Sequence, residues 1–479
     1  MRPVWMNAIE SAQKEDDQAI AIRYLDKVER LHEISYRQLG DDIQHAIAWL
    51  YQNVKPIQGA HIGILANNSY HYVVCLLAVI CTGGVAIPLN TQNSLSEIRY
   101  ETALAEITFL LYDGIYGRLE PDFEQEYREF LLPIDGYTHT DEKKKWSEPE
   151  PSDMAMMIFT SGTTGKSKAV VLNAFAANAW AKGYSEFFYG SLKNVLREPI
   201  NFYLCHPLYH AYSIGLLMSS LSNEYTVCMN VDIGAFVRDI NALSCNCSAM
   251  VPATIKILTR LLKRGRRESV GGIRDILCEG AALDMETITY MRGQGIHITL
   301  GYGLTENTIC TMNHLSGDEP LSSPGSVCPH SQIRIIDGEV LVKSDSMMDG
   351  YYKDPEATAQ VIRDGWLHTG DLGEIDEDGY LYLTGRKKNL IILDSGENVS
   401  PEELEALLSE NALIQEVIVK EKNHQICAEV YCREDDRLPV EDFIEKVNGE
   451  IAMYKRITLV EFRDEPFPKT GSGKIKRNL

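Results

Sequence analysis

Apolar and polar residues follow one another along the first two thirds of the chain in blocks that predict strands separated by helices. The strand-like blocks are short, apolar and rich in β-branched or aromatic residues, and they begin at residues 61, 85, 107, 154, 201, 225, 248 and 298. Helix-like stretches separate many of them, as in residues 36–53 and 252–265. This alternation predicts an α/β chain with largely parallel sheets, because parallel strands need the crossover connections that helices supply.

The pattern changes after about residue 322, where β-rich segments carry Asp-Gly turn signals at 337–338 and 378–379. A helix start follows: we predict Ser400 as the N-cap, Pro401 as the first helical residue and Glu403 as the partner that completes a capping box. About the last 90 residues predict a small α+β unit of two helices and three strands that ends in a short basic segment.

Composition adds limits to this picture. With 479 residues the chain is long enough for two or more domains, and its formal net charge of −22 argues against a uniform nucleic-acid-binding surface. The longest apolar run, residues 72–80, fits a buried helix, because a bilayer span takes roughly 20 residues. The N-terminus has no apolar signal region and the 11 cysteines show no regular spacing, so we expect a cytoplasmic protein without a membrane span.

Glycines, hydroxyls and lysines gather in the segment MIFTSGTTGKSKAVV, residues 157–171, directly after a predicted strand. Glycines let backbone N–H groups converge on an anion, hydroxyls add donors and lysine adds charge, so the segment predicts a phosphate-binding loop. The P-loop of nucleoside triphosphatases does not match, because Thr160 stands where that motif requires glycine.

The same loop, SGTTGKSKA, resembles the signature loop of the adenylate-forming superfamily of acyl-CoA synthetases, luciferases and adenylation domains, which reads roughly S-G-T-T-G-x-P-K-G. Ser167 replaces the usual proline and Ala169 the usual glycine, so we expect retained binding with a slightly altered loop path. Further segments resemble family motifs in the same order along the chain: PLYHAYSIG (207–215), CEGAALD (278–284), GYGLTE (301–306), GEVLVKSDSMMDGYYKDPEAT (338–358), WLHTGDLGEIDEDGYLYLTGRKKNLI (366–391) and PKTGSGKIKR (468–477). The first 150 residues resemble the family only in pattern.

The resemblance implies a fold and a reaction. The fold is a large N-terminal domain, residues 1–386, of parallel-rich sheets flanked by helices plus a β-barrel-like subdomain, and a small mobile α+β domain, residues 387–479. In the reaction a carboxylate attacks the α-phosphorus of ATP to give acyl-AMP and pyrophosphate, and a thiol then displaces AMP. Such a reaction depends mainly on positioning and charge neutralisation.

By the same resemblance, one set of residues holds the nucleotide. The residues implied for the β- and γ-phosphates are Thr160, Ser161, Gly162, Thr163, Thr164 and Lys168. Thr305 would contact the α-phosphate and Glu306 would bind Mg²⁺, which prefers oxygen ligands. Tyr302 would lie against adenine, with Gly280 and Ala281 as the opposite wall. Asp371 would accept hydrogen bonds from both ribose hydroxyls, and Arg386 would add a ribose or phosphate contact.

Three further residues have roles implied by the resemblance. Lys474 would stand between the attacking carboxylate and the α-phosphate, Lys388 would be the hinge about which the small domain rotates, and His210 would line the acyl pocket. His206 and His210 also stand four residues apart, as zinc ligands on a helix can, but Pro207 would break such a helix and no second ligand pair follows.

The segment His210–Ser213 has no acidic residue to pair with an α-ammonium group, which disfavours a free amino acid as substrate. Aromatic and small neighbours favour an aryl, fatty or other mainly apolar carboxylic acid. Coenzyme A is the expected thiol, which makes ATP, Mg²⁺ and coenzyme A the expected cofactors. A separate carrier protein bearing phosphopantetheine is the alternative acceptor, a catalytically inactive ATP-binding scaffold is an alternative of another class, and the acid and the oligomeric state stay open.

Overall fold

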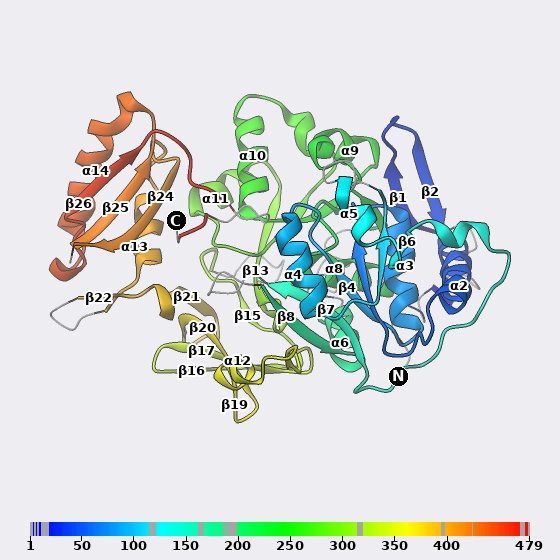
Figure 1. The fold of residues 1–479 in the computed structure, drawn as a ribbon. Coiled ribbons are helices and arrows are strands. Elements are labelled where there is room, and N and C mark those ends of the chain that lie inside the picture. Colours follow the sequence, from blue (N-terminus) through cyan, green and yellow to red (C-terminus); the bar gives the residue numbers. More distant parts are fainter. Residues whose placement is uncertain are drawn as a thin grey trace.

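The structure is a computed structural model. It describes residues 3, 6, 9–10, 19–114, 121–160, 167–184, 188, 199–313, 320–393, 398–423, 425–469 and 475–477. In this part of the chain, two large sheets flanked by helices form the main body, and a smaller α+β unit lies to one side (Figure 1).

One sheet has seven strands in the order β18-β8-β7-β4-β3-β5-β6. Its strands are β3 (His61–Leu65), β4 (Val85–Pro88), β5 (Phe109–Tyr112), β6 (Leu131–Pro133), β7 (Met154–Thr160), β8 (Lys168–Asn173) and β18 (Gly350–Tyr351). The strands from β7 to β6 are parallel, whereas β8 and β18 are antiparallel additions. In the β7–β8 hairpin, Thr160 lies opposite Lys168, so both ends of the predicted phosphate loop are fixed by the sheet.

The second large sheet has nine strands in the order β15-β14-β13-β12-β11-β9-β10-β1-β2. They are β1 (Ile20–Leu25), β2 (Leu31–Ser35), β9 (Asn201–Leu204), β10 (Thr226–Met229), β11 (Cys247–Met250), β12 (Asp275–Cys278), β13 (His297–Leu304), β14 (Thr308–Met312) and β15 (Ser326–Val327). The six strands from β13 to β1 are parallel. The two large sheets contain all eight strands predicted from the sequence blocks, and those predictions are confirmed.

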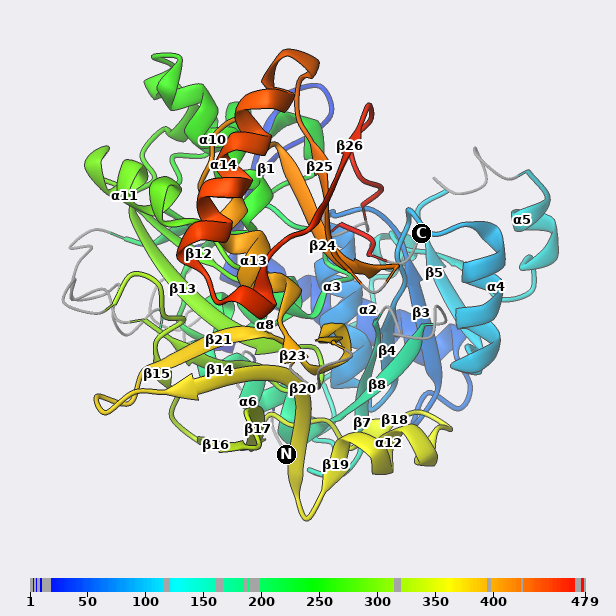
Figure 2. The same cartoon turned by 90° about the vertical axis from the view of Figure 1, so that its left-hand side faces the viewer.

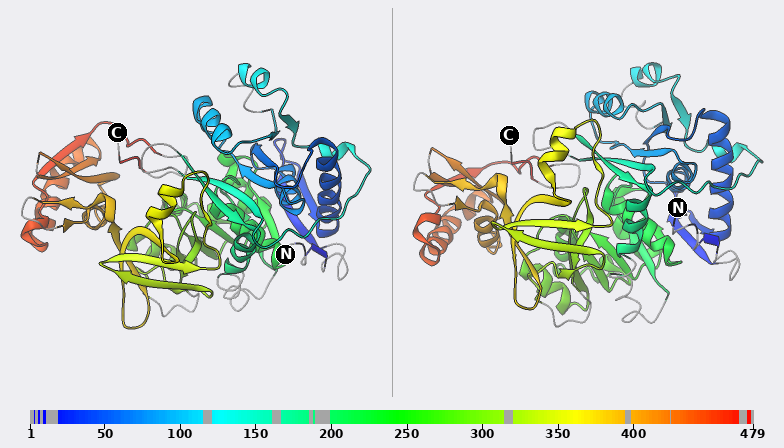
Figure 3. Two further views of the ribbon diagram at one scale, coloured as in Figure 1. Left: turned by 60° about the horizontal axis from the view of Figure 1, so that its bottom comes forward. Right: turned by 90° about the horizontal axis from the view of Figure 1, so that it is seen from below.

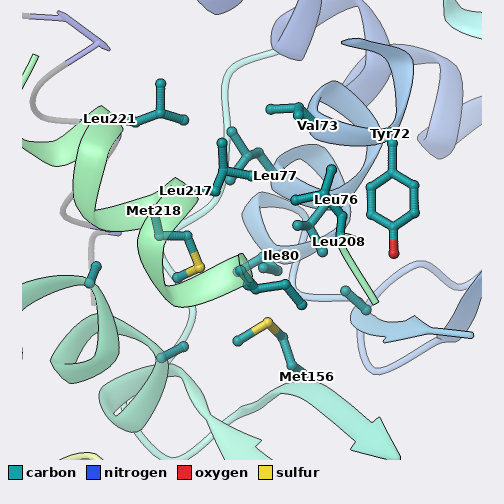
Figure 4. Packing of buried hydrophobic residues seen from close by; sticks show 14 of the residues in the cluster. Tyr72, Val73, Leu76, Leu77, Ile80, Met156, Leu208, Leu217, Met218 and Leu221 are labelled. Carbon is teal, nitrogen blue, oxygen red and sulfur yellow. The ribbon is translucent and has the colours of Figure 1, made fainter. Parts of the chain in front are cut away.

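Helices cover these sheets and pack between them. They include α2 (Tyr36–Asn53), α3 (Tyr70–Cys81), α4 (Leu95–Leu104), α6 (Ala174–Tyr184), α8 (Ala211–Ser222), α9 (Phe236–Ala242), α10 (Pro252–Lys263) and α11 (Met285–Gly293). The apolar run 72–80 belongs to α3, whose side chains pack against α8 and against Met156 of β7 (Figure 4). A helix that is apolar on most sides must be covered by protein on more than one side, here by α8 and by β7. No helix in the described ranges has the length and apolarity that a membrane crossing requires.

A five-stranded antiparallel sheet follows in the chain. It consists of β16 (Ser331–Ile336), β17 (Glu339–Ser344), β19 (Ile362–Arg363), β20 (Trp366–Ile375) and β21 (Leu381–Arg386), with α12 (Pro355–Val361) before β19. Asp337 and Gly338 have φ of 49° and 78°, and they form the two-residue hairpin turn that their sequence predicts. In both views of Figure 3 this yellow segment lies next to the orange C-terminal unit.

The C-terminal unit comprises η6 (Lys387–Asn389), β22 (Ile391–Ile392), β23 (Asn398–Val399) and α13 (Pro401–Leu408), then β24 (Glu416–Lys422), β25 (Gln425–Tyr431), α14 (Arg437–Glu450) and β26 (Leu459–Arg463). Its three-stranded sheet and two longer helices enclose a separate hydrophobic cluster that begins at Ile391 and ends at Ile457. Figure 2 shows this unit with α13 next to β21, so the unit adjoins the main body through the end of the antiparallel sheet. The two helices and three strands predicted for this unit are confirmed as α13, α14 and β24–β26.

The predicted capping box at Ser400 is wrong. Ser400 is the N-cap of α13, but its side chain accepts no hydrogen bond from the helix. Instead the hydroxyl donates to the carbonyl of Thr384 over 2.7 Å, and Glu403 pairs with Lys455 at 2.7 Å. A contact between the unit and the main body therefore takes the place of the local cap. A capping box does occur at α4, between Ser94 and Glu97.

Candidate active site

Tyr302 of β13, Asp371 of β20 and Arg386 of β21 meet where the nine-stranded and antiparallel sheets adjoin. The Tyr302 hydroxyl donates to Oδ2 of Asp371 over 2.8 Å, and Nε of Arg386 donates to Oδ1 over 2.7 Å. Asp371 is 5% exposed and Tyr302 is 7% exposed. Burial, followed by the charge of Asp371, raises the pKa of Tyr302 well above its usual range, so the phenol remains a donor. The structure thus brings together three of the predicted residues.

Gly280 and Ala281 follow β12, the parallel neighbour of β13, and both are exposed. The register pairs Cys278 with Leu300, so Gly280 and Tyr302 both stand two residues beyond that pair. Gly280 has φ of 92°, a conformation that favours glycine and turns the chain away from the strand. Both predicted walls of the adenine pocket therefore lie at the carboxyl ends of adjacent parallel strands, where open α/β sheets bind ligands.

Thr305 and Glu306 occupy the turn between β13 and β14. The hydroxyl of Tyr351 donates to Oε1 of Glu306 over 2.8 Å, and Lys168 Nζ lies 4.7 Å from the centre of the Tyr351 ring. Burial and then the charge of Glu306 raise the pKa of Tyr351. The sequence alone assigned no role to Tyr351, although this tyrosine directly follows a glycine in the family-like segment GYYKDPEAT.

The Tyr351 contacts connect Glu306 to the β7–β8 hairpin that carries Thr160 and Lys168. Four of the predicted phosphate-binding residues, Ser161, Gly162, Thr163 and Thr164, lie outside the described residues. The hairpin nevertheless delivers Thr160 and Lys168 to the same side of the molecule as Glu306.

His206 and His210 do not share a helix. His210 is the N-cap of α8, and Pro207 separates it from His206. The backbone N–H of Val251 donates to Nε2 of His206 over 3.1 Å, and burial lowers the pKa of His206 to about 4. His206 is therefore a neutral residue that joins the ends of β9 and β11, while His210 stands at the start of α8 with its ring 4.4 Å from that of Tyr209.

Lys388 lies in η6, immediately after β21 and the Arg386–Asp371 pair. Partial burial, followed by the charge of Arg386, lowers the pKa of Lys388. In the basic C-terminal segment, Lys474 lies outside the described residues, whereas Arg477 pairs with Glu402 at 3.4 Å and with Glu405. Lys469 pairs with Glu416 at 2.6 Å, so two cations of this segment are held by the C-terminal unit.

Sequence reasoning also missed Glu279, which stands between β12 and Gly280 and is 6% exposed. The hydroxyl of Tyr184 donates to Oε2 of this residue over 3.1 Å, and burial raises its pKa to about 8. The available signal was an acidic residue directly after the apolar run 276–278, inside the motif CEGAALD.

Parallel sheets whose carboxyl ends carry an exposed glycine and a buried Tyr–Asp pair, joined by the partly exposed Arg386, are typical of α/β enzymes that bind ligands at that edge. The model of the AMP-binding enzyme family matches residues 9–352 of this chain, and the chain belongs to that family. The family prediction made from the motifs is confirmed.

Curated relatives include the 2-succinylbenzoate–CoA ligases of Bacillus cytotoxicus, 29% identical over 446 residues, and of Bacillus mycoides, 29% identical over 442 residues. The matches cover 88% of this chain and of the first relative, and 87% of this chain and of the second.

Solved structures with the same fold include O-succinylbenzoate coenzyme A synthetase of Bacillus subtilis in complex with AMP, with a TM-score of 0.83 and 24% identity. ATP-bound MatB of Rhodopseudomonas palustris has a TM-score of 0.86 and 23% identity. Each match covers 100% of this chain and 98% of the other. These likenesses confirm the predicted fold class.

Proposed function

We propose that this protein is an AMP-forming acid–CoA ligase that activates a mainly apolar, aryl or fatty carboxylic acid as acyl-AMP and then forms the CoA thioester. The observation that carries the proposal is the Tyr302–Asp371–Arg386 group at the strand ends of a chain in the AMP-binding enzyme family. The curated relatives support it, because they are ligases that join an aryl acid to CoA.

In the first half-reaction, a carboxylate oxygen of the acid attacks the α-phosphorus of ATP, and the bond to the β-phosphate oxygen breaks to release pyrophosphate. Asp371 accepts hydrogen bonds from the ribose hydroxyls: Tyr302 and Arg386 each use one of its oxygens, and a carboxylate has further lone pairs to offer. Tyr302 lies against adenine, and Gly280 and Ala281 form the opposite wall of its pocket. Thr160, Lys168 and the loop residues Ser161–Thr164 hold the β- and γ-phosphates, and Thr305 contacts the α-phosphate.

Glu306 fits the requirements of a magnesium site. No group of three or more His, Cys, Asp or Glu that could hold a metal occurs within the described ranges. Mg²⁺ bound with a nucleotide uses one or two carboxylates together with phosphate oxygens, so a single carboxylate is sufficient. The hydrogen bond from Tyr351 fixes the direction of the Glu306 carboxylate. When bound, the ion neutralises negative charge on the phosphates.

The C-terminal unit supplies the mobile part of the proposal. We assign residues 1–386 and 387–479 to two domains, with the separate hydrophobic cluster from Ile391 to Ile457 as support. Lys474 neutralises the charge that develops between the carboxylate and the α-phosphate. Rotation about Lys388 then withdraws Lys474 before the second half-reaction, in which the CoA thiol attacks the acyl carbon and AMP leaves.

Incubation with ATP, Mg²⁺ and a panel of carboxylic acids that includes 2-succinylbenzoate tests the proposal. AMP, pyrophosphate and thioester are followed with and without CoA, and we expect AMP, pyrophosphate and a CoA thioester in equal amounts for at least one acid. If the acyl group of acyl-AMP is transferred only to a phosphopantetheine carrier protein, the acceptor is that carrier and not CoA. ADP with free phosphate, or no nucleotide turnover with any acid, would overturn the ligase assignment.

A further inference from the structure

Glu279 has a hydrogen-bonding capacity that the protein leaves unused. Its side chain is buried at the end of β12, and Oε2 accepts from the Tyr184 hydroxyl over 3.1 Å. Oε1 has no hydrogen-bond partner among the residues that the structure describes. A buried polar atom without a partner costs about 1 to 3 kcal/mol, so its presence calls for an explanation.

The neighbours of Glu279 adjoin residues of the candidate active site in the sequence. On one side lies Gly301 of β13, where an added Cβ would stand 2.8 Å from Oε1 of Glu279, so the missing side chain makes room for the carboxyl group. Tyr212, in the first turn of α8, is also close: burial and then the charge of Glu279 raise its pKa, and its hydroxyl donates to the carbonyl of Leu277 over 3.1 Å. The Tyr212 and Tyr184 rings are 6.3 Å apart.

This position is intermediate between the two ends of the proposed site. Glu279 directly precedes Gly280, which borders the adenine pocket, and Gly301 directly precedes Tyr302. Tyr212 stands two residues after His210, which lines the proposed acyl pocket. The carboxyl group therefore lies between residues assigned to the adenine pocket and the helix that begins after His210.

The protonation state gives Glu279 a definite role. Burial raises its pKa to about 8, so at neutral pH most molecules carry a neutral carboxylic acid here. Since Tyr184 donates to Oε2, the proton belongs on Oε1, which is then a donor without an acceptor in the described protein. An apolar side chain would fill the same space without this desolvation cost.

We propose that Oε1 of Glu279 donates a hydrogen bond to an oxygen atom of the acid substrate other than its reacting carboxylate. The preferred substrates are then aryl or fatty acids that carry a keto, ether or second carboxyl oxygen, rather than pure hydrocarbons. This inference rests on the proposed function, because it assigns specificity to the acid pocket of that ligase. It narrows the substrate class to acids with one additional acceptor.

Matched pairs of acids that differ in one carbonyl oxygen test the inference. Suitable pairs are 4-oxo-4-phenylbutanoate with 4-phenylbutanoate, and 4-acetylbenzoate with 4-ethylbenzoate. Pyrophosphate release gives kcat/KM for each acid, and calorimetry gives its dissociation constant independently of turnover. For at least one pair we expect the wild type to prefer the keto acid by about tenfold or more, since a pocket built to hydrogen-bond a substrate discriminates against analogues that lack the partner.

Substitutions connect the preference to Glu279. Glu279→Leu should reduce the keto preference to about onefold, whereas Glu279→Gln should retain most of it, because the amide keeps a donor. Asp275→Asn is the matched control. Asp275 is a fully buried carboxylate at the start of the same strand with no hydrogen-bond partner for either oxygen in the described chain, and its substitution should leave the ratio unchanged.

Several results would overturn the inference. If the wild type shows no preference for the keto acid in either pyrophosphate release or calorimetry, the inference is overturned, whether or not Glu279→Leu folds. Loss of activity toward both members of each pair by the same factor in Glu279→Leu would show a structural role only. If Glu279→Leu turns over both acids of a pair with the same ratio of kcat/KM values as the wild type, the inference is refuted and the ligase assignment stays intact. If the wild type neither turns over nor binds any of the acids, the inference and the ligase assignment are both refuted.

Discussion

The candidate site of the main body and the surface of the C-terminal unit place their charged residues in different surroundings. In the main body, Asp371 within β20 and Glu279 at the end of β12 are both buried in the candidate site. In the C-terminal unit, side chains such as Lys420, Lys455 and Arg463 form ion pairs with neighbouring carboxylates and are 22–41% exposed. Buried polar groups are costly and hold a fixed geometry, whereas partly exposed pairs contribute little and leave a surface free to move. In the proposed function, one part of the chain binds the nucleotide in both half-reactions and the other contributes to each in turn.

Lys474→Ala should produce the largest effect and should separate the two half-reactions. Without its ammonium group, the rate of acyl-AMP formation should fall about 100- to 1000-fold, the usual loss when one transition-state charge partner is removed. Thioester formation from supplied acyl-AMP and CoA should change by less than about threefold, because Lys474 is withdrawn in that step. Both rates are measured by rapid quench with radiolabelled nucleotide.

Lys476→Ala is the control, since Lys476 is exposed in the same basic segment. Its substitution should leave both half-reactions within about twofold of the wild type, as expected for a solvated charge. An equal loss of both half-reactions in Lys474→Ala would contradict the division of work between the two parts of the molecule.

Asp371→Ala should have the next largest effect, and it should impair both half-reactions. The substitution removes the ribose acceptor and leaves Arg386 without its partner, so kcat/KM for ATP should fall about 100-fold. Because acyl-AMP contains the same ribose, kcat/KM for supplied acyl-AMP should fall similarly. Steady-state kinetics with each nucleotide checks this, and Asp378→Ala, at an exposed position in the following turn, should match the wild type. A defect confined to one half-reaction would show that Asp371 does not hold the ribose.

The sequence predicted those parts of the fold that depend on local pattern. Eight strands of the two large sheets, the buried helix α3 and the Asp337-Gly338 hairpin follow from periodicity and turn chemistry, and the structure contains them. The capping box at Ser400 failed because a contact with Thr384 competes for the hydroxyl, and no local pattern encodes that contact. Propensity describes a segment in isolation, whereas tertiary contacts decide where side chains point.

The same distinction holds for the site. The motifs identified Tyr302, Asp371 and Arg386, but their hydrogen bonds depend on β13 and the β20–β21 pair lying side by side. Glu279 escaped notice because its burial is a property of the folded sheet and of the space at Gly301. Tyr351 escaped notice because its contact with Glu306 joins two segments separated by 45 residues.

The pH dependence of stability should distinguish Glu279 from the surface carboxylates of the C-terminal unit. Since folding raises the pKa of Glu279 from its ordinary value of about 4.5 to about 8, its contribution is fully present below about pH 4.5 and is lost as the pH rises through 8. The free energy of unfolding should therefore fall by about 1.4 kcal/mol per pH unit between about pH 5 and 8 from this group alone. The nearby Tyr184 and Cys310 have raised pKa values and stay neutral in this window.

Urea unfolding of the wild type and of Glu279→Gln across this range isolates the contribution. The difference between their free energies of unfolding should change by about 2 to 3 kcal/mol from pH 5.5 to 7.5, because the amide does not ionise. If the difference between the two free energies of unfolding stays constant with pH, Glu279 titrates in its ordinary range. Its carboxyl group would then be ionised at neutral pH and could not donate a hydrogen bond to the acid.

The smallest effect is expected at the surface of the C-terminal unit. Lys446 and Glu450 of α14 are 4.0 Å apart with side chains 72% and 68% exposed, so Lys446→Ala should change the free energy of unfolding by less than about 0.5 kcal/mol. Ile444→Ala on the same helix is the reference, because this side chain is 2% exposed and its truncation should cost about 2 to 5 kcal/mol. If the unit is stabilised by its own core, Ile444→Ala should shift the unfolding of α14 and β24–β26, followed by hydrogen exchange, and spare the strands around Asp371. Loss of protection in both parts together would show that they unfold as one unit.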